Sequence, residues 1–118
     1  MKTSVKRQWI EDLRSGNFLQ GKGLLWYQEE ADGPKYYCCL WVLGERQCPD
    51  APEGELGESR FDHYRESSRG LLSRDTIEKL GLAGADQWLL ARMNDEGDDF
   101  KTIANWIEAN IPEEAEGE

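Results

Sequence analysis

The chain has 118 residues, including five Trp, four Tyr and three Phe, so it can form one domain with a single, well-filled core. Its formal charge of −10 disfavours nucleic acid as a partner, because an acidic surface repels the phosphate backbone. No apolar run approaches the roughly 20 residues of a membrane-spanning helix, which excludes that class of protein.

The composition also indicates a compartment. Three Cys residues are typical of reduced thiols rather than of a disulfide framework, since an odd count leaves one over. The N-terminus does not lead into a signal-peptide core, because residues 9–10 are followed at once by two acidic residues. We therefore expect a cytoplasmic protein.

The negative charge is unevenly distributed. Residues 94–118 carry −8, whereas residues 1–27 carry +3. Such an acidic surface suits a basic protein partner, or serves solubility alone.

The first predicted helix covers residues 4–15. Val5, Trp9 and Leu13 recur every four residues, which places them on one apolar stripe. Gly16 is well placed for the left-handed residue that closes a helix. Two residues can cap the first turn: Thr3 and Ser4. Four charged residues are expected to face away from the core: Lys6, Arg7, Glu11 and Arg14.

Residues 17–23 are predicted to form a loop that Gly21 and Gly23 keep tight. A Gly-Lys-Gly sequence can bind phosphate through backbone N–H groups, but this one lacks the rest of a dinucleotide or P-loop motif. We therefore prefer a structural turn. Residues 24–28 have strand composition and are predicted to pair with residues 35–38 across an Asp-Gly-Pro turn.

Residues 36–43 form the longest run without a charged, Gly or Pro residue, and we expect this run to be interior. Periodicity cannot separate a buried strand from a buried helix in so short a run. We predict a strand through Tyr37, then a short helix that Gly44 ends. The run contains the adjacent thiols of Cys38 and Cys39.

The next segment is predicted to be largely irregular. Residues 45–60 hold Pro and Gly among acidic side chains, which is typical of an exposed loop, and Cys48 lies in it. Residues 61–65 alternate as in a short strand, and residues 67–70 are a turn.

Thiol chemistry would need a base, and His63 is the only histidine. Cys38 or Cys39 with His63, and an Asp such as Asp62, is therefore the only thiol–imidazole arrangement available. Apolar surroundings raise the pKa of a thiol and make it inert, so we interpret the two cysteines as core residues. Zinc is disfavoured, because adjacent cysteines lack the spacer that lets two thiolates reach one ion.

Two short helices are predicted in the second half. Ser73 is the expected N-cap of the first, which runs to Leu80, and Gly81 is the left-handed residue that closes it. The second is predicted over residues 87–93 with Asp86 as its cap. Its inner face is expected to hold three residues, with Trp88 beside them: Leu89, Leu90 and Met93.

Residues 94–99 pack four carboxylates and one carboxamide into six positions, a composition that suits a hard cation. The alternation of an EF-hand and its closing glutamate are absent. We therefore prefer a structural role, in which Gly97 makes the turn and Asp98 or Asp99 caps a last helix over residues 100–110.

Three motifs occur in order along the chain. The first motif is Leu-Arg-Ser-Gly (residues 13–16) with Gln-Gly-Lys-Gly-Leu (20–24). The second is Tyr-Cys-Cys-Leu-Trp-Val-Leu (37–43). The third is Met-Asn-Asp-Glu-Gly-Asp-Asp-Phe (93–100), followed by Ile-Ala (103–104) and Ile-Glu (107–108). This order resembles a family of small uncharacterised proteins of bacteriophages and bacterial genomes, in which glycine stands at the position of Trp41. The resemblance implies an accessory protein of phage type and a small α+β domain, and it carries over no activity.

The expected fold is α+β: a single domain over residues 1–111, in which a short antiparallel hairpin or sheet is packed by three to four helices. Residues 112–118 are expected to be a flexible acidic tail.

Two functions are compatible with this chain. The first is a non-enzymatic binding or inhibitory module that occupies a host protein or sequesters a small ligand, with no cofactor or metal. The alternative is a small enzyme or nucleotide-binding protein. Its site would comprise the matched polar or special positions: Gln20, Gly21, Gly23, Cys38, Cys39, Asn94 and Asp95. Their meeting around one cleft would favour the alternative, and burial of both thiols would favour the first.

Overall fold

The structure is a computed structural model that describes residues 1–23, 25–28, 30, 32–48 and 71–114. Its elements are α1 (Thr3–Arg14), β1 (Leu19–Gln20), β2 (Trp26–Gln28), β3 (Lys35–Tyr37), α2 (Cys39–Gln47), α4 (Arg74–Leu80), α5 (Gly84–Glu96) and α6 (Phe100–Asn110). The predicted α+β class is confirmed. The strand predicted at residues 61–65, the turn at 67–70 and His63 lie outside the described residues.

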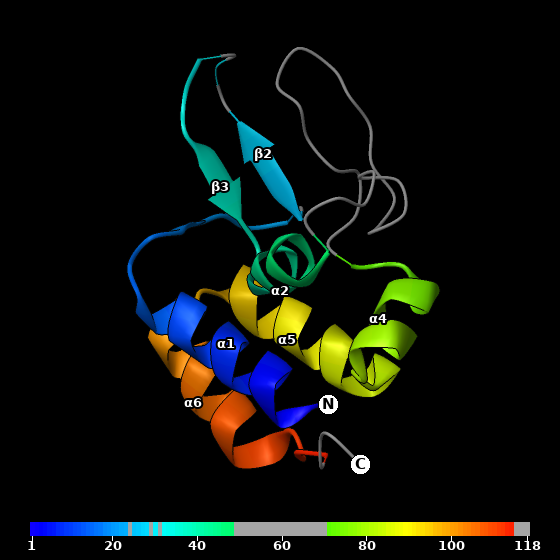
Figure 1. Cartoon of the computed structure of the whole chain (residues 1–118). Helices are drawn as coiled ribbons and strands as arrows, with labels where there is room; N and C mark the ends of the chain where they lie inside the picture. The colour runs from blue at the N-terminus through cyan, green and yellow to red at the C-terminus, as the bar shows by residue number, and fades with distance from the viewer. Residues whose placement is uncertain (24, 29, 31, 49–70, 115–118) are drawn as a thin grey trace.

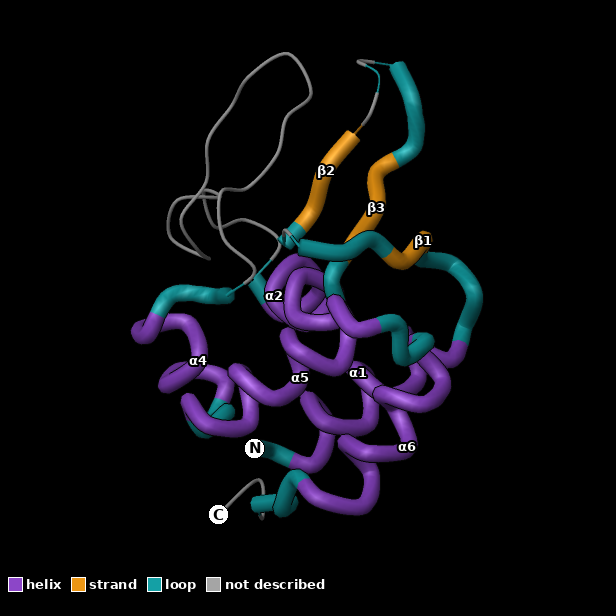
Figure 2. The backbone as a smooth tube through the Cα atoms, turned by 180° about the vertical axis from the view of Figure 1, so that it is seen from behind, coloured by secondary structure: helices purple, strands orange, loops and turns teal. Residues whose placement is uncertain are grey.

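Four helices, α1, α4, α5 and α6, form the helical body of the molecule, and the hairpin of β2 and β3 projects away from it (Figure 1). α5 lies between α4 and α6 and contacts both, and α6 in turn packs on α1 (Figure 2). α2 lies between these helices and the sheet, where it contacts α1, α5 and β3. In the part of the chain that the structure describes, no helix is long and apolar enough to cross a membrane.

The sheet has the strand order β1-β3-β2. β2 and β3 pair antiparallel, with Tyr27 opposite Tyr36, so the predicted hairpin is confirmed. β1 adds a parallel edge in which Leu19 faces Tyr36, inside the segment predicted to be only a loop. That prediction was wrong because a two-residue strand has no periodicity of its own and depends on the neighbouring edge of β3.

The apolar run at residues 36–43 was expected to be interior throughout, but Tyr36 and Tyr37 are half-buried in β3, and only Cys38 to Leu43 belong to the buried core. The predicted change from strand to helix after Tyr37 is confirmed, since α2 begins at Cys39. From Cys38 to Gly44 every residue is buried. Gly44 does not end α2, as was predicted, and the helix continues to Gln47. A glycine inside a helix costs only about 1 kcal/mol relative to alanine, which buried neighbours on α2 offset.

α1 packs antiparallel on α6 and confirms the predicted first helix. Lys6 was expected to face away from the core, but it is buried, and its Nζ donates to the carbonyl of Glu108 at 3.1 Å. That carbonyl belongs to the last turn of α6, where a cation interacts favourably with the helix dipole. Neither Thr3 nor Ser4 is the N-cap of α1; Lys2 occupies that position without a side-chain cap.

α4 forms as its local sequence predicts. The Ser73 hydroxyl accepts a hydrogen bond from the backbone N–H of Thr76, and Gly81 closes the helix with φ +78°. The N–H of Leu82 donates to the Ile77 carbonyl at 2.9 Å, which completes a Schellman motif.

α5 is longer than predicted. It begins at Gly84 after an N-cap at Ala83, so Asp86 lies inside its first turn and does not cap it. Leu89 is exposed and not part of an inner face, whereas Leu90 is fully buried as expected. The helix is oriented by its buried polar residues, which a search for apolar periodicity does not count.

α6 confirms the last predicted helix, with Asp99 accepting from the N–H of Thr102 at 2.8 Å and Gly97 in the left-handed region before it. Beyond Pro112 the chain contacts the N-terminus, because the N–H of Glu114 donates to the Met1 carbonyl at 2.8 Å. The rest of the segment predicted to be a tail, residues 115–118, lies outside the described residues.

Candidate functional site

Of the seven positions singled out in the sequence, Cys38 precedes Cys39 in the chain and Gly23 bonds Asp95. Four others, Gln20, Gly21, Cys39 and Asp95, contact the side chain of Asn94. It projects from the last turns of α5 and is fully buried. Its Oδ1 accepts from Gln20 Nε2 at 3.0 Å and from the backbone N–H of Cys39 at 3.3 Å. Its Nδ2 donates to the Gly21 carbonyl at 2.7 Å and is 3.5 Å from Oδ1 of Asp95. A carboxamide has two donor and two acceptor positions, so this side chain is saturated.

We call these contacts the Asn94 junction: Gln20, Gly21, Gly23, Cys38, Cys39, Asn94 and Asp95. Gln20 Nε2 also donates to the Asp98 carbonyl at 2.7 Å, and the N–H of Gly23 donates to Asp95 Oδ1 at 2.7 Å. The junction therefore ties the segment around β1 to the first turn of α2 and to the end of α5.

Asn94 acts as a cap for α2 supplied by another helix. Cys38 occupies the N-cap position of α2 but provides no side-chain hydrogen bond. The N–H of Cys39, one of the helix's unpaired first-turn donors, is satisfied by Asn94 instead. A structural reason therefore exists for an asparagine at this position.

Both thiols of the junction are buried, with Cys38 at 1% and Cys39 at 0% exposure. Burial, with a smaller contribution from Cys38, raises the pKa of the Cys39 thiol well above its ordinary value. Its Sγ lies 3.7 Å from the Leu90 carbonyl. A thiol in this state is a poor nucleophile, because the thiolate is the reactive species.

Gly21 closes the junction on its outer side. A Cβ at this glycine would lie 2.6 Å from Cε1 of Tyr27 and 2.9 Å from Cβ of Tyr36. The two tyrosine rings stack with centroids 5.1 Å apart. The glycine is thus required for close packing of backbone against side chains, and its N–H is already used by the Tyr37 carbonyl at 2.8 Å.

A surface hollow lies on the outer face of α5. It has a volume of about 390 Å³ and is lined by Leu71, Trp88, Ala91, Arg92, Asp95 and Glu96. Trp88 is 60% exposed, the highest value among the large apolar side chains that the structure describes. We call this surface the Trp88 hollow. Asp95 belongs both to it and to the Asn94 junction.

The sequence placed Trp88 beside an inner face and so missed this hollow. The phase of α5 is set by Gln87, Leu90 and Asn94, which are all buried. Gln87 is buried because it exchanges hydrogen bonds with the backbone of Leu72, at 2.8 Å and 3.3 Å. The sequence did contain a signal for the exposure of Trp88. A helix that begins at Gly84 and buries the carboxamides of Gln87 and Asn94 places Trp88 on its outer face.

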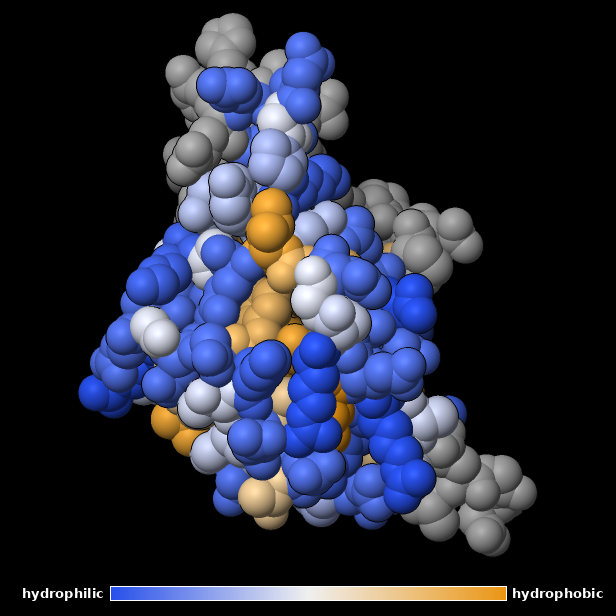
Figure 3. All heavy atoms as spheres, turned by 90° about the vertical axis from the view of Figure 1, so that its left-hand side faces the viewer, coloured by the Kyte–Doolittle hydropathy of each residue, from blue (hydrophilic) through white to orange (hydrophobic). Residues whose placement is uncertain are grey.

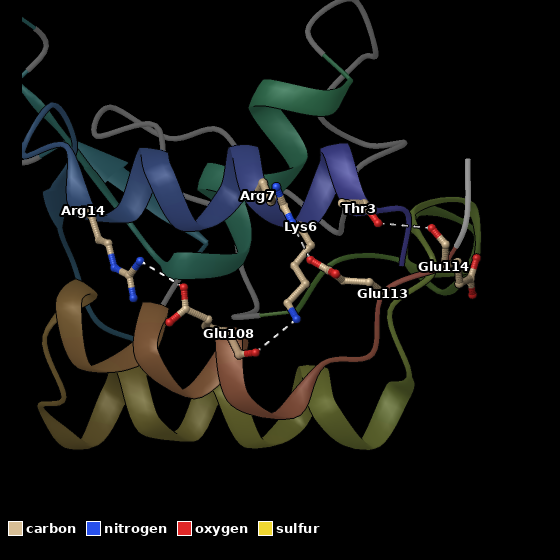
Figure 4. Close-up of polar contacts among 7 residues, drawn as sticks. All are labelled: Thr3, Lys6, Arg7, Arg14, Glu108, Glu113 and Glu114. Carbon is tan, nitrogen blue, oxygen red and sulfur yellow. Dashed lines mark hydrogen bonds and ion pairs between the residues drawn. The ribbon is translucent and has the colours of Figure 1, made fainter. Parts of the chain in front are cut away.

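A larger groove, of about 790 Å³, lies between α1 and α6. Figure 3 shows that side of the molecule, where an apolar strip is flanked by hydrophilic residues. Figure 4 shows the cations of α1 pointing to carboxylates and a carbonyl across the groove. Arg14 pairs with Glu108 at 3.4 Å and Arg7 with Glu113 at 3.6 Å. The first pair connects α1 to α6, and the second connects α1 to the segment that follows α6. The groove is lined by equal numbers of basic and acidic side chains, so it has no excess of either charge.

Comparisons with known proteins give no relative. No protein-family model, no curated protein and no solved structure matches the chain. The described residues also contain no group of three or more His, Cys, Asp or Glu side chains arranged to hold a metal ion.

Proposed function

We propose that this protein is a non-enzymatic binding module that acts by occupying a partner macromolecule. The observation that carries the proposal is Trp88, which is 60% exposed at a hollow of about 390 Å³. Tryptophan is among the residues that contribute most to protein interfaces, and large exposed apolar groups beside a concave surface are typical of binding sites.

The Asn94 junction also supports a non-enzymatic function. The groups that could bind a ligand or react are engaged inside the fold: the Asn94 amide bonds the Gly21 carbonyl and the Cys39 N–H, and the Cys39 thiol is buried against the Leu90 carbonyl. Of the seven junction residues, only Asp95 lines either of the two hollows described above.

The proposed setting is a small accessory protein of phage type in the cytoplasm of a bacterial host. Its support is the resemblance of the three sequence motifs and the acidic charge of −10, which favours a protein partner over nucleic acid. Inhibition of the bound host protein is the effect that simple occupancy would produce.

The alternative, a small enzyme or nucleotide-binding protein, has one observation in its favour. Four of the residues assigned to its site, Gln20, Gly21, Cys39 and Asp95, contact Asn94, and Gly23 bonds Asp95. It would require the junction to open, because the side chains now bond to each other and both thiols are buried.

Affinity capture from bacterial lysate tests the proposal, with native mass spectrometry to detect a co-purifying small ligand. The Trp88→Ala variant is compared with wild type and with Leu19→Ala, which removes another exposed apolar side chain, 47% exposed, from β1. We expect a protein that wild type and Leu19→Ala retain and Trp88→Ala loses. A partner retained equally by Trp88→Ala, or a small molecule whose binding requires Asn94, would contradict the proposal.

A further inference from the structure

The Trp88 hollow has an apolar part and an acidic end. Leu71, Trp88 and Ala91 form the apolar part. Asp95 and Glu96 line it on the last turn of α5, so both chemistries are presented by one helix. A ligand that fills the hollow therefore contacts an aromatic side chain and carboxylates together.

The acidic end is unfavourable for α5 on its own. The C-terminus of a helix carries partial negative charge, which disfavours carboxylates and favours cations. The last turn of α5 nevertheless holds Asp95 and Glu96 and no basic residue. Asp98 and Asp99 follow within three residues of the helix end, although Asp99 has a role as the N-cap of α6.

Three cations of the chain partly offset this charge. Arg92 Nε pairs with Glu96 Oε1 at 2.9 Å, and both side chains are well exposed. Lys22 Nζ lies by Gly97, 3.7 Å from where a Cβ of that glycine would be. The charge of Lys101 acts on Asp99. Four carboxylates over residues 95–99 against these three cations leave one negative charge in excess, and the lining of the hollow, with Asp95 and Glu96 against Arg92, has the same excess.

We infer that the Trp88 hollow binds a cationic protein segment that inserts one bulky apolar side chain and places a Lys or Arg against Asp95 and Glu96. This inference rests on the proposed function and names the chemistry of its partner. A second copy of the chain is disfavoured as the occupant, because two surfaces of a protein with charge −10 would bring like charges together.

The geometry also sets a spacing. Trp88 and Asp95 are seven residues apart on α5, which corresponds to about 10 Å along a helix with a rise of 1.5 Å per residue. In an extended segment, about three residues separate two side chains by that distance. The segment should therefore carry its cation about three residues from the apolar anchor when it binds in extended form.

Synthetic peptides of Gly and Ser are the probes for this inference. The first carries one Phe with two Lys residues beginning three positions away, the second has Glu in place of Lys, and the third has Ser in place of Phe. The protein is labelled with 5-fluorotryptophan, and the fluorine signal of Trp88 among its five Trp residues is assigned with the Trp88→Phe variant.

We expect the Phe–Lys peptide to shift the Trp88 signal saturably and the other two peptides to bind about tenfold more weakly or not at all. Raising the salt concentration should weaken the Phe–Lys complex, because exposed charges are screened. Glu96→Gln should also weaken the complex, because it removes a carboxylate that is 63% exposed at the hollow and that neutralises Arg92. Glu113→Gln, at the α1–α6 groove, is the matched control and should bind the peptide as wild type does.

Equal binding of the Lys and Glu peptides would contradict the inference that the partner is cationic, but it would not contradict the proposed binding function. A Trp88 signal that moves with protein concentration alone would make a second copy the occupant and overturn the inference. So would the absence of any response at Trp88. The proposed function fails separately, if lysate capture does not depend on Trp88.

Discussion

Single residues decide how this small domain holds its polar interior, and Asn94 is the clearest case. Its one carboxamide bonds Gln20 and Gly21 in the β1 segment and Cys39 in α2, all of them more than 50 residues away in the sequence. Buried polar groups are costly when their partners are removed, because the remaining groups are left without water or protein contacts.

Asn94→Ala should therefore lower the free energy of unfolding by about 3 kcal/mol, since a buried amide N–H, a carbonyl and a carboxamide lose their partner together. Urea unfolding followed by circular dichroism measures this change. Asn110→Ala removes an exposed carboxamide that, among the described residues, bonds one carbonyl, that of Trp106, at 2.9 Å, and it should cost well under 1 kcal/mol. Equal effects of the two substitutions would argue against a special role for the junction.

Tyr37 provides a prediction about pH. Its burial, and after that the charge and hydrogen bond of Glu45, raise the pKa of its hydroxyl to about 12 from the ordinary 10.0. Between these two values the folded state holds a proton that the unfolded state has released. The contribution of Tyr37 to stability is therefore complete below pH 10 and is lost as the pH rises toward 12.

Ultraviolet difference titration measures this ionisation, and Tyr37→Phe identifies which transition belongs to Tyr37. Glu45→Gln should lower the pKa of Tyr37 but leave it above 10.0, because burial is the larger cause. A Tyr37 that titrates at its ordinary pKa in the wild-type protein would show that the hydroxyl is not buried as described.

At the scale of elements, the packing of the β1 segment under the tyrosine stack depends on Gly21. Gly21→Ala should lower the free energy of unfolding by about 2 to 3 kcal/mol, because the new Cβ would overlap Tyr27 and Tyr36. Gly84→Ala is the control, since a Cβ there has no atom within 4 Å and lies in the first turn of α5.

The control substitution should be neutral or slightly stabilising, because alanine restricts the unfolded chain more than glycine does. Thermal unfolding of both variants gives the comparison. A Gly21→Ala protein as stable as Gly84→Ala would mean that the segment around β1 does not pack on the hairpin as the structure shows.

The elements also show what the sequence could predict. α4 and α6 follow from local signals, because Ser73, Gly81 and Asp99 act on atoms a few residues away. β1 and the phase of α5 do not, because each depends on a partner distant in the chain, such as Leu72 for Gln87. The burial of Lys6 is of the same kind, since its bonding partner, the Glu108 carbonyl, is 102 residues away.

For the molecule as a whole, the candidate site could be predicted only in part from the sequence. Four of the residues selected from the sequence, Gln20, Gly21, Cys39 and Asp95, do lie against the side chain of Asn94. Their saturation by one another could not be predicted, since it depends on the distances between α2, α5 and the β1 segment. The Trp88 hollow was missed for a different reason, because the predicted inner face of α5 counted apolar residues and not the buried carboxamides of Gln87 and Asn94.

The central claim is that the chemically capable groups are enclosed in the fold and that binding takes place on its outside. Titration of the native protein with a chromogenic disulfide reagent tests it most directly. We predict rapid reaction of one thiol, that of the half-buried Cys48, and reaction of all three only after unfolding. Rapid labelling of Cys38 or Cys39 in the folded protein would contradict this account and revive an enzymatic function.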